Sequence, residues 1–489
     1  MFSKARVVDL STDPFGLTEV PRKLYYKWLF GGPCYDSLKT IGRMSVCFAL
    51  LLMSPSLAFS QALRFQPQSA DAAGQGNAFV AQADSAAAIQ YNPAGLTQVG
   101  GIQAMFGTVL MGGSIKATSP TGIDTRGDFG GSVVFPPPSH TYVSANLRSF
   151  GWEKLSDFTV GFGLTSPYGL STRYPVDGPF STATTSAALP LLDIKPTLAY
   201  KVNAEVSLGV SADIYTFASF LGEGHAEQRL ISPGIAGIPA GASIEVNGGG
   251  TAAGVTVSLL YTPLKNAEGK PIASIGLVYR SQAVLPLNGA LLVNGQKVAD
   301  ASTNLVLPAI YTGGMAIWPI RTKELEWKLE LDLDWVGWQS MKNLDLHLST
   351  GTTVPQPQQW KGVPVIAVGT EYKWLNPNWL PQWEVAVRSG YTRTESPVPD
   401  LTFNPGILSL SANTISVGVG FLCKQGGHFL GVVSCGGQSA LWPKAIGLDI
   451  AYQEWIYEGH TVSGNQNPTV DGTYDAHVHL GVISFKFVF

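Results

Sequence analysis

Charged residues are scarce in this chain. They make up 13% of its 489 residues, about half the share of a soluble domain, whereas hydrophobic residues stand at an ordinary 45%. So few charges do not cover a large water-facing surface, but they suffice for a protein that faces lipid. The formal net charge of -3 argues against nucleic acid as a partner.

Long hydrophobic runs are also missing, with one exception at residues 44–59. This run is short for a membrane-spanning helix, and Pro55 interrupts it. Basic residues precede it and small residues follow, so residues 44–62 are predicted to be a secretory signal peptide; a short anchor helix is the alternative. Residues 1–43 are interpreted as an extended or mis-assigned N-terminus, with Met44 as the favoured start.

Cysteine is rare, and two of the four cysteines lie in the presequence. Cys423 and Cys435 remain, on either side of a glycine-rich stretch. In an oxidising periplasm they are predicted to form a disulfide that closes a turn. Metal binding is the alternative, but no Cys or His spacing supplies four ligands, so no metal or cofactor is expected.

A run near the middle of the chain alternates apolar and charged residues at every step. Residues 324–335 read E-L-E-W-K-L-E-L-D-L-D-W. In an extended strand the leucines and tryptophans point to one side and the charges to the other. Roughly 9–11 residues of tilted strand cross a bilayer, and a wall with lipid outside and a wet lumen inside needs this pattern. The run therefore predicts a transmembrane β-barrel.

Similar alternation recurs along the chain and predicts an antiparallel barrel of fourteen strands, an even number that leaves both termini on one side. The predicted strands are residues 100–116, 129–148, 157–169, 191–202, 205–220, 251–263, 271–283, 305–319, 323–339, 362–374, 381–395, 412–423, 444–458 and 476–489.

The connections between these strands alternate in length. Short ones, such as 203–204 and 320–322, are predicted to be periplasmic turns, and long ones, such as 221–250, 284–304 and 340–361, outward loops. The long connection 424–443 breaks the alternation and carries the cysteine pair.

Aromatic residues mark the ends of the predicted strands. Two girdles are expected at the membrane interfaces, formed by Trp318, Trp374, Trp379, Trp383 and Trp442 at one end and by Trp335, Trp338, Trp360 and Trp455 at the other. The chain ends in I-S-F-K-F-V-F, the usual ending of outer-membrane barrels, which the barrel assembly machinery reads. An ordinary hydrophobic C-terminal strand is the alternative.

Before the first strand lie about 35 residues that do not alternate. Small residues dominate them, and a turn follows at Asn92–Gly95. Residues 63–98 have about the right size to fold inside the lumen as a hatch, which leaves residues 99–489 for the barrel.

In this segment the sequence resembles the long-chain fatty acid transporter family of outer-membrane proteins, which includes aromatic-hydrocarbon channels. The resemblance rests on F-Q at 65–66, Q-S-A at 68–70, G-x-G-N-A-F at 74–79, D-S at 84–85 and above all Y-N-P-A-G-L at 91–96. Later echoes follow in order, among them S-P-Y-G at 166–169, K-P-T-L-A-Y at 195–200 and S-P-V-P-D at 396–400.

The resemblance implies a monomeric, fourteen-stranded barrel with an N-terminal hatch, in the outer membrane of a Gram-negative-type bacterium. Its implied function is uptake of long-chain fatty acids or similar hydrophobic compounds by passive, ligand-gated diffusion, with exit sideways through the wall. Outer-membrane lipids and lipopolysaccharide are expected as surroundings. Hatches of this family often carry two adjacent acids, where this chain has only Asp84.

Two apolar outward segments are candidates for the first contact with a hydrophobic substrate, because a soluble protein avoids such exposure. The candidate binding residues are Leu230, Ile231, Ile235, Leu285, Leu287 and Leu291. The alternative is that the two segments merely pack on each other.

Three further features are candidate functional sites. Asn92, Pro93 and Ala94 match the hatch motif and are predicted to act in gating, with a rigid turn as the alternative. Phe65 is predicted to fill the lumen until ligand displaces it. Arg388 is a weak candidate for a substrate carboxylate; pairing with luminal acids such as Glu330 or Asp332 is favoured instead.

Catalysis finds little support, because no histidine lies in a nucleophile motif. His477 and His479 share a strand face near the outer rim, where an interfacial role is favoured over metal binding. A barrel lipid hydrolase would need a Ser–His pair, for which no candidate is present. A general or aromatic-hydrocarbon-selective porin is the remaining alternative.

Overall fold

The computed structural model describes residues 62–133, 138–218, 224–234, 237–437 and 442–489. The predicted N-terminal extension, and the predicted signal peptide except for Ala62, lie outside the described residues. The described residues belong to one compact unit, residues 58–489. Among them, no helix is both long and apolar enough to cross a membrane.

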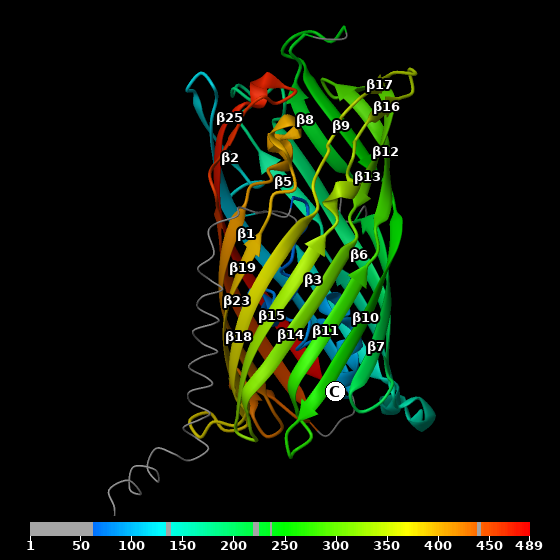
Figure 1. Ribbon diagram of the computed structural model, residues 1–489, viewed down its shortest axis with the longest axis vertical. Helices are drawn as coiled ribbons and strands as arrows, with labels where there is room; N and C mark the ends of the chain where they lie inside the picture. The colour runs from blue at the N-terminus through cyan, green and yellow to red at the C-terminus, as the bar shows by residue number, and fades with distance from the viewer. Residues whose placement is uncertain (1–61, 134–137, 219–223, 235–236, 438–441) are drawn as a thin grey trace, which may run out of the picture. The chain divides into compact units, whose positions relative to one another are not determined.

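Fourteen antiparallel strands of the described part close into a barrel (Figure 1). Consecutive barrel strands pair with each other, and the first strand pairs with the last from Gln103–Val488 to Thr118–Thr473. The strands are β1 (Ile102–Thr118), β3 (Ser139–Asn146), β4 (Phe158–Thr165), β6 (Ser186–Lys201), β7 (Val206–Phe217), β10 (Ala252–Lys265), β11 (Pro271–Arg280), β14 (Ile310–Arg321), β15 (Leu325–Val336), β18 (Val363–Trp374), β19 (Trp383–Thr394), β20 (Ala412–Cys423), β23 (Ala445–Tyr457) and β25 (Gly472–Val488).

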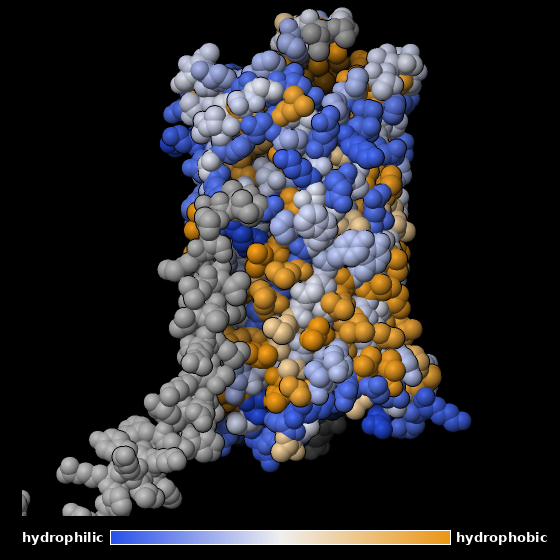
Figure 2. Space-filling model, in the orientation of Figure 1, coloured by the Kyte–Doolittle hydropathy of each residue, from blue (hydrophilic) through white to orange (hydrophobic). Residues whose placement is uncertain are grey.

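Strand β15 confirms the prediction from its alternating sequence. Lys328, Glu330 and Asp332 are buried inside, whereas Leu333 and Trp335 are about half exposed on the outer face. Figure 2 shows the consequence on one side of the molecule, where apolar side chains gather in a band between hydrophilic ends. This band has the character of a lipid-facing surface.

Shorter strands extend the wall beyond the barrel at the end with long connections (Figure 1). They are β2 (Asp124–Asp128), β5 (Gly169–Arg173), β8 (Ala226–Ile231), β9 (Ser243–Gly249), β12 (Ala283–Val293), β13 (Gln296–Leu307), β16 (Leu346–Leu348), β17 (Thr353–Val354) and β24 (His460–Val462). The connections 221–250, 284–304 and 340–361 lie at this end as predicted, but they contain paired strands and are not plain loops. Hairpins above the membrane need no lipid-facing side, so their sequences lack the alternation that would have revealed them.

Strand boundaries and tryptophan positions also need correction. Strand β3 begins ten residues after the predicted start at 129, and β14 begins at Ile310 because residues 305–307 belong to β13. Trp318, Trp338 and Trp360 are buried at 8%, 0% and 4% exposure, so they do not belong to the predicted girdles. Sequence position alone does not decide which way a side chain points near a strand end.

Short 3₁₀ helices lie in the connections. They are η2 (Leu147–Phe150), η3 (Glu153–Leu155), η5 (Trp338–Ser340), η6 (Asp400–Thr402), η7 (Pro405–Ile407) and η8 (Pro468–Val470). In the long connection after β20, a disulfide joins Cys423 to Cys435 and encloses the hairpin of β21 (His428–Phe429) and β22 (Val433–Ser434). Phe429 of this hairpin is buried against Trp383, with ring centroids 6.0 Å apart.

The N-terminal segment, residues 62–98, lies within the barrel. It contains α3 (Ala70–Ala73), α4 (Ala88–Tyr91) and η1 (Pro93–Gln98), and its hydrogen bonds reach inward side chains around the wall. Ser484 of β25 accepts from the Ala70 amide at 2.9 Å, and Ser274 of β11 donates to the Ala81 carbonyl at 2.7 Å. The segment therefore spans the lumen from one side of the barrel to the other.

Two carboxylates of β15 bind four consecutive amides of this segment. Asp332 accepts from the amides of Phe79 and Val80 at 2.8 and 3.0 Å. Glu330 accepts from the amides of Ala81 and Gln82 at 2.6 and 3.2 Å. All these groups are buried, and Lys328 pairs with the second oxygen of Glu330 at 2.7 Å, so the hydrogen bonds to Glu330 are charge-assisted and strong. We refer to this contact as the carboxylate clamp.

Glycines let the segment approach the wall. A Cβ atom on Gly209 of β7 would lie 2.3 Å from the Ala94 nitrogen, and one on Gly390 of β19 would lie 2.1 Å from the Gln75 carbonyl carbon. No real contact is that short, so any larger residue at these positions would push the segment inward.

We predict that replacing the clamp carboxylates, as in Glu330→Gln/Asp332→Asn, loosens the N-terminal segment without preventing barrel assembly. The loss of charged acceptors weakens bonds worth roughly 1.5–3 kcal/mol each. Hydrogen exchange at residues 79–82 should accelerate by at least about tenfold, measured by mass spectrometry on the folded barrel. The exposed Asp475→Asn on β25 is the control, and equal protection in both variants would contradict the clamp.

Removal of the disulfide is expected to act locally. In Cys423→Ser/Cys435→Ser, the β21–β22 hairpin loses its covalent closure, which should expose residues 424–434 to limited proteolysis. The barrel strands should stay resistant, because their pairing does not depend on the hairpin. A variant as resistant as the parent at residues 424–434 would mean that packing alone holds this hairpin.

Candidate functional site

The outward extensions surround a cavity of ≈ 380 Å³, which we call the outer cavity. This volume lies within the range of small-molecule sites, about 300–1,000 Å³. Its walls come from β5, β6, β8, β9, β12 and β13 and from segments near residues 344–358, 402–407 and 465–470. The apolar side chains that line it include Leu63, Leu170, Leu189, Leu230, Leu287, Leu305, Leu344, Leu346, Phe403 and Ile407.

The polar residues of this lining are nearly all neutral. They are serine, threonine, asparagine and glutamine, and Glu227 is the one charged residue among the described lining residues. Arg229 pairs with Glu227 at 3.1 Å and with Glu245 at 3.1 Å, although Arg229 itself does not line the cavity. The lining thus offers apolar surface and neutral hydrogen-bonding groups but no cation.

The N-terminal segment reaches the outer cavity at Leu63, which is 2% exposed. Residues 63–65 run beside residues 167–169: the Phe65 amide donates to the Pro167 carbonyl at 2.8 Å, and the Gly169 amide donates to the Leu63 carbonyl at 2.9 Å. Residues 166–168 separate β4 from β5, so the segment supplies hydrogen bonds where this strand is interrupted. Gln68 adds two more, to the carbonyl and amide of Ser166, both at 3.0 Å.

An aromatic group lies in the apolar core that Leu63 shares with the outer cavity. The ring centroid of Trp338 is 6.5 Å from that of Tyr168 and 5.1 Å from that of Trp360. The Tyr168 hydroxyl and both indole nitrogens are buried without a hydrogen-bond partner among the described residues. Unpaired buried polar groups are costly, and these three belong to one aromatic group.

Below this core, polar residues close the lumen. Arg64 pairs with Asp334 at 2.6 Å, and the Tyr91 hydroxyl donates to the Gln66 carbonyl at 3.0 Å. Burial raises the pKa of the Tyr91 phenol, which keeps its proton available for this bond. Two small cavities of ≈ 50 and ≈ 40 Å³ lie here, and Arg64, Gln66 and Asn77 line both. Neither cavity has room for a hydrophobic solute.

The Asn92–Ala94 turn joins the segment to the wall. The Asn92 amide group donates to the Val80 carbonyl at 2.8 Å and to the Leu259 carbonyl of β10 at 3.2 Å, while its oxygen accepts from the Ala94 amide at 3.2 Å. Pro93 begins η1, where its fixed φ is suitable and no amide is required. Asn92 is fully buried and links the chain next to the carboxylate clamp to a barrel strand.

The predicted site residues fall into different places. Leu230 and Leu287 line the outer cavity, and Leu285 is buried in the core beneath it. Ile231 and Leu291 lie on the same hairpins but not in the lining, and Ile235 lies outside the described residues.

Phe65 and Arg388 lie away from the outer cavity. Phe65 packs against Trp455 with ring centroids 6.0 Å apart. Arg388 is buried and pairs with Glu371 at 2.7 Å and with Asp449 at 2.6 Å, rather than with the predicted Glu330 or Asp332. The predicted role of Arg388, pairing with luminal acids, is confirmed, but the two acids named as its partners are wrong, because strand register is not visible in the sequence.

Leu63, Tyr168, Trp338 and Trp360 were not recognised from the sequence as site residues. The two tryptophans had been assigned to a girdle, and Leu63 lies in a segment without periodicity. The S-P-Y-G sequence at 166–169 was the one available indication, because proline and glycine interrupt strands.

Comparisons with known proteins agree with this architecture. A Pseudomonas aeruginosa FadL homologue of known structure is 17% identical, covers 88% of this chain and 100% of its own, and has a TM-score of 0.65. The Ralstonia pickettii toluene transporter TbuX (17% identical, 88% and 99% coverage, TM-score 0.58) and the Pseudomonas putida toluene transporter TodX (16%, 89% and 99%, TM-score 0.56) share the fold.

Among curated proteins, an outer membrane protein of Neisseria meningitidis serogroup B is 34% identical over 119 residues, which are 23% of this chain and 24% of that protein. The match thus spans about a quarter of that relative's length. Residues 52–427 match the family described as Outer membrane protein transport protein (OMPP1/FadL/TodX). Because this match covers most of the chain, the protein belongs to this family of outer-membrane transport channels.

Proposed function

We propose that the protein takes up neutral or weakly polar hydrophobic compounds from outside the cell through the outer cavity. The observation that carries this proposal is the lining of that cavity, which is rich in leucine and contains no arginine or lysine among the described residues. A carboxylate bound there would lose its hydration without gaining a counter-charge. A hydrocarbon, or the neutral part of a lipid, has no such penalty. Two structural relatives are named toluene transporters, which agrees with this substrate class.

The proposed path continues from the outer cavity past Leu63 to the aromatic group of Tyr168, Trp338 and Trp360. The N-terminal segment acts as a hatch: when ligand displaces Leu63, residues 166–168 lose the hydrogen bonds that this segment supplies. The wall then opens at residues 166–168, between β4 and β5, and this opening would let the substrate leave sideways into the membrane. Movement of residues 62–68 suffices, so the carboxylate clamp stays closed.

The remaining parts of the proposal follow from the barrel. We propose further that it acts as a monomer without enzymatic activity or cofactor. Phe485 and Phe487 on the final strand are suited to the barrel assembly machinery. The apolar outer band is suited to membrane lipid, with lipopolysaccharide around the extensions.

We predict that purified protein binds a fluorescent long-chain fatty acid, and that a fatty alcohol of the same length and toluene displace it as readily as the unlabelled acid does. Leu287→Asp should weaken binding by at least about tenfold, because it puts a charge into the apolar lining. Leu291→Asp is the matched control on the same hairpin, outside the lining. A strict requirement for the carboxylate, or equal effects of both substitutions, would contradict the proposed cavity and substrate class.

We also predict that Asn92→Ala slows uptake severalfold while the barrel still assembles. The substitution removes one hydrogen bond to Val80, one to Leu259 of β10 and one within the turn, so the part of the hatch from which residues 62–68 move loses its defined position. Uptake by cells and heat-dependent electrophoretic mobility measure the two effects. Asn203→Ala is the control, because Asn203 binds the amides of Glu205 and Val206 in an exposed turn. Uptake equal to that of the parent would exclude a gating role for Asn92.

A further inference from the structure

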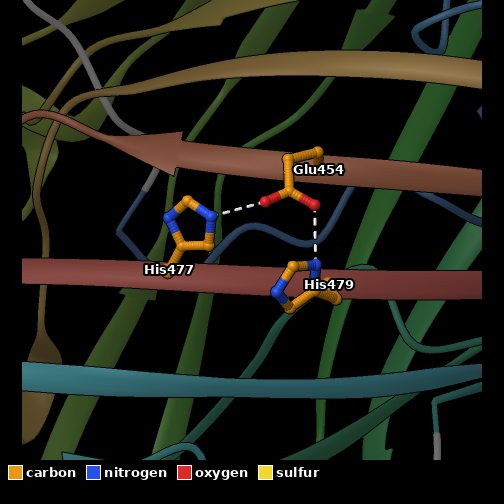
Figure 3. A group of neighbouring side chains, drawn as sticks. All are labelled: Glu454, His477 and His479. Carbon is orange, nitrogen blue, oxygen red and sulfur yellow. Dashed lines mark ion pairs between the residues drawn. The ribbon is translucent and has the colours of Figure 1, made fainter.

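Three side chains with metal-binding atoms meet on the outer wall of the barrel. His477 and His479 alternate on β25 and therefore point to the same side, and Glu454 of β23 is paired in register with His479. Figure 3 shows the carboxylate of Glu454 between the two imidazoles. Its oxygens lie 2.5 Å from Nε2 of His477 and 2.6 Å from Nδ1 of His479.

We propose that Glu454, His477 and His479 form a binding site for a divalent transition-metal ion, zinc foremost. Two imidazole nitrogens and one carboxylate oxygen are a ligand set that zinc uses with a fourth position left open. The ligand atoms already lie within 4.8 Å of one another. In tetrahedral zinc sites, bond lengths of about 2.0–2.1 Å separate the ligand atoms by roughly 3.3 Å, so the present contacts need to open by only about 0.8 Å.

The backbone and surroundings favour this geometry. Pairing of β23 with β25 fixes the three Cα positions, and the side chains are exposed enough to adjust, at 50% for His477, 54% for His479 and 20% for Glu454. Tyr452, two residues before Glu454, donates a hydrogen bond to Glu454 Oε2 and lies 2.7 Å from Nδ1 of His479. A hydroxyl of this kind orients a ligating carboxylate.

Among the described residues, no lysine or arginine pairs with this group. In the described part of the chain, the ion pairs of Glu454 are those to the two histidines. A second cluster, His225, Glu227 and Glu245, differs in this respect, because Arg229 bridges both of its carboxylates at 3.1 Å and already supplies the positive charge. The second cluster thus provides a comparison with the same residue types and no expected metal.

The proposed metal site lies where the outer surface changes from charged to apolar residues. Toward the extensions, the exposed Lys116 and Asp475 are paired in register on β1 and β25. Toward the barrel, Leu110 and Ile450 are exposed and apolar. The open coordination position therefore faces outward at the edge of the apolar band, away from the lumen, and metal binding is independent of the transport path.

Zinc titration of the folded, tag-free protein in detergent tests this proposal. We expect one ion per chain with a dissociation constant below about 10 μM, and at least about tenfold weaker binding for His477→Gln and for His479→Gln. Cobalt in place of zinc should give the visible absorption of a tetrahedral site. His225→Gln, in the second cluster, should leave both results unchanged. Uptake of hydrophobic compounds should not change in any of these variants, which separates this proposal from the proposed function.

The proposal is overturned if the parent protein binds no zinc saturably, or if binding survives His477→Gln/His479→Gln. If His225→Gln alone loses zinc binding, the metal site is the second cluster, and this result also overturns the proposal. Because the substituted side chains are exposed on the outer wall, the variants should fold, and heat-dependent electrophoretic mobility checks that they do.

Discussion

The carboxylate clamp is the interaction on which the interior of this protein depends. Asp332 and Glu330 project into a lumen from which the N-terminal segment excludes water, so each carboxylate needs donors from the protein. The segment has four adjacent amides, at residues 79–82, that need acceptors equally. Each of the four amides thereby gains an acceptor, Lys328 pairs with the second oxygen of Glu330, and the same strand presents leucine and tryptophan to lipid.

In the proposed mechanism, the clamp divides the N-terminal segment into a fixed and a displaceable part. An apolar ligand supplies no hydrogen bonds, so it does not replace the carboxylate–amide bonds at residues 79–82. At Leu63 the contacts are apolar, and a hydrophobic ligand replaces them with contacts of the same kind. In the proposed mechanism, Leu63 is therefore the point at which ligand acts, whereas residues 70–98 stay with the barrel. A hydrophobic ligand can open the hatch only if the apolar contacts that it replaces, at Leu63, are separate from the hydrogen bonds that hold the rest of the segment.

The barrel was predictable from the sequence, because a strand between lipid and lumen needs apolar and polar residues in alternation. Residues 324–335 show this alternation. The hairpins above the membrane were missed since paired strands in water have no such requirement. The outer cavity was found only in part: Leu230 and Leu287 lie in conspicuous apolar segments, but Leu63 does not. The sequence does not reveal the register between neighbouring strands. The partners of Arg388 and the position of Glu454 beside His479 therefore appeared only in the structure.

Charge pairing inside the lumen bears on the choice between neutral and anionic substrates. Arg64 below the outer cavity is bound to Asp334, and Arg388 deeper in the barrel is bound to Glu371 and Asp449. A carboxylate that recruited either arginine would leave a buried acid without its partner, a change that costs about 3–5 kcal/mol when buried pairs are broken. A neutral molecule competes for neither arginine, and the unpaired donors of the described residues along the proposed path include those of Thr303, Tyr168, Trp338 and Trp360. A weakly polar oxygen on an otherwise apolar substrate would satisfy one of those donors without breaking any ion pair.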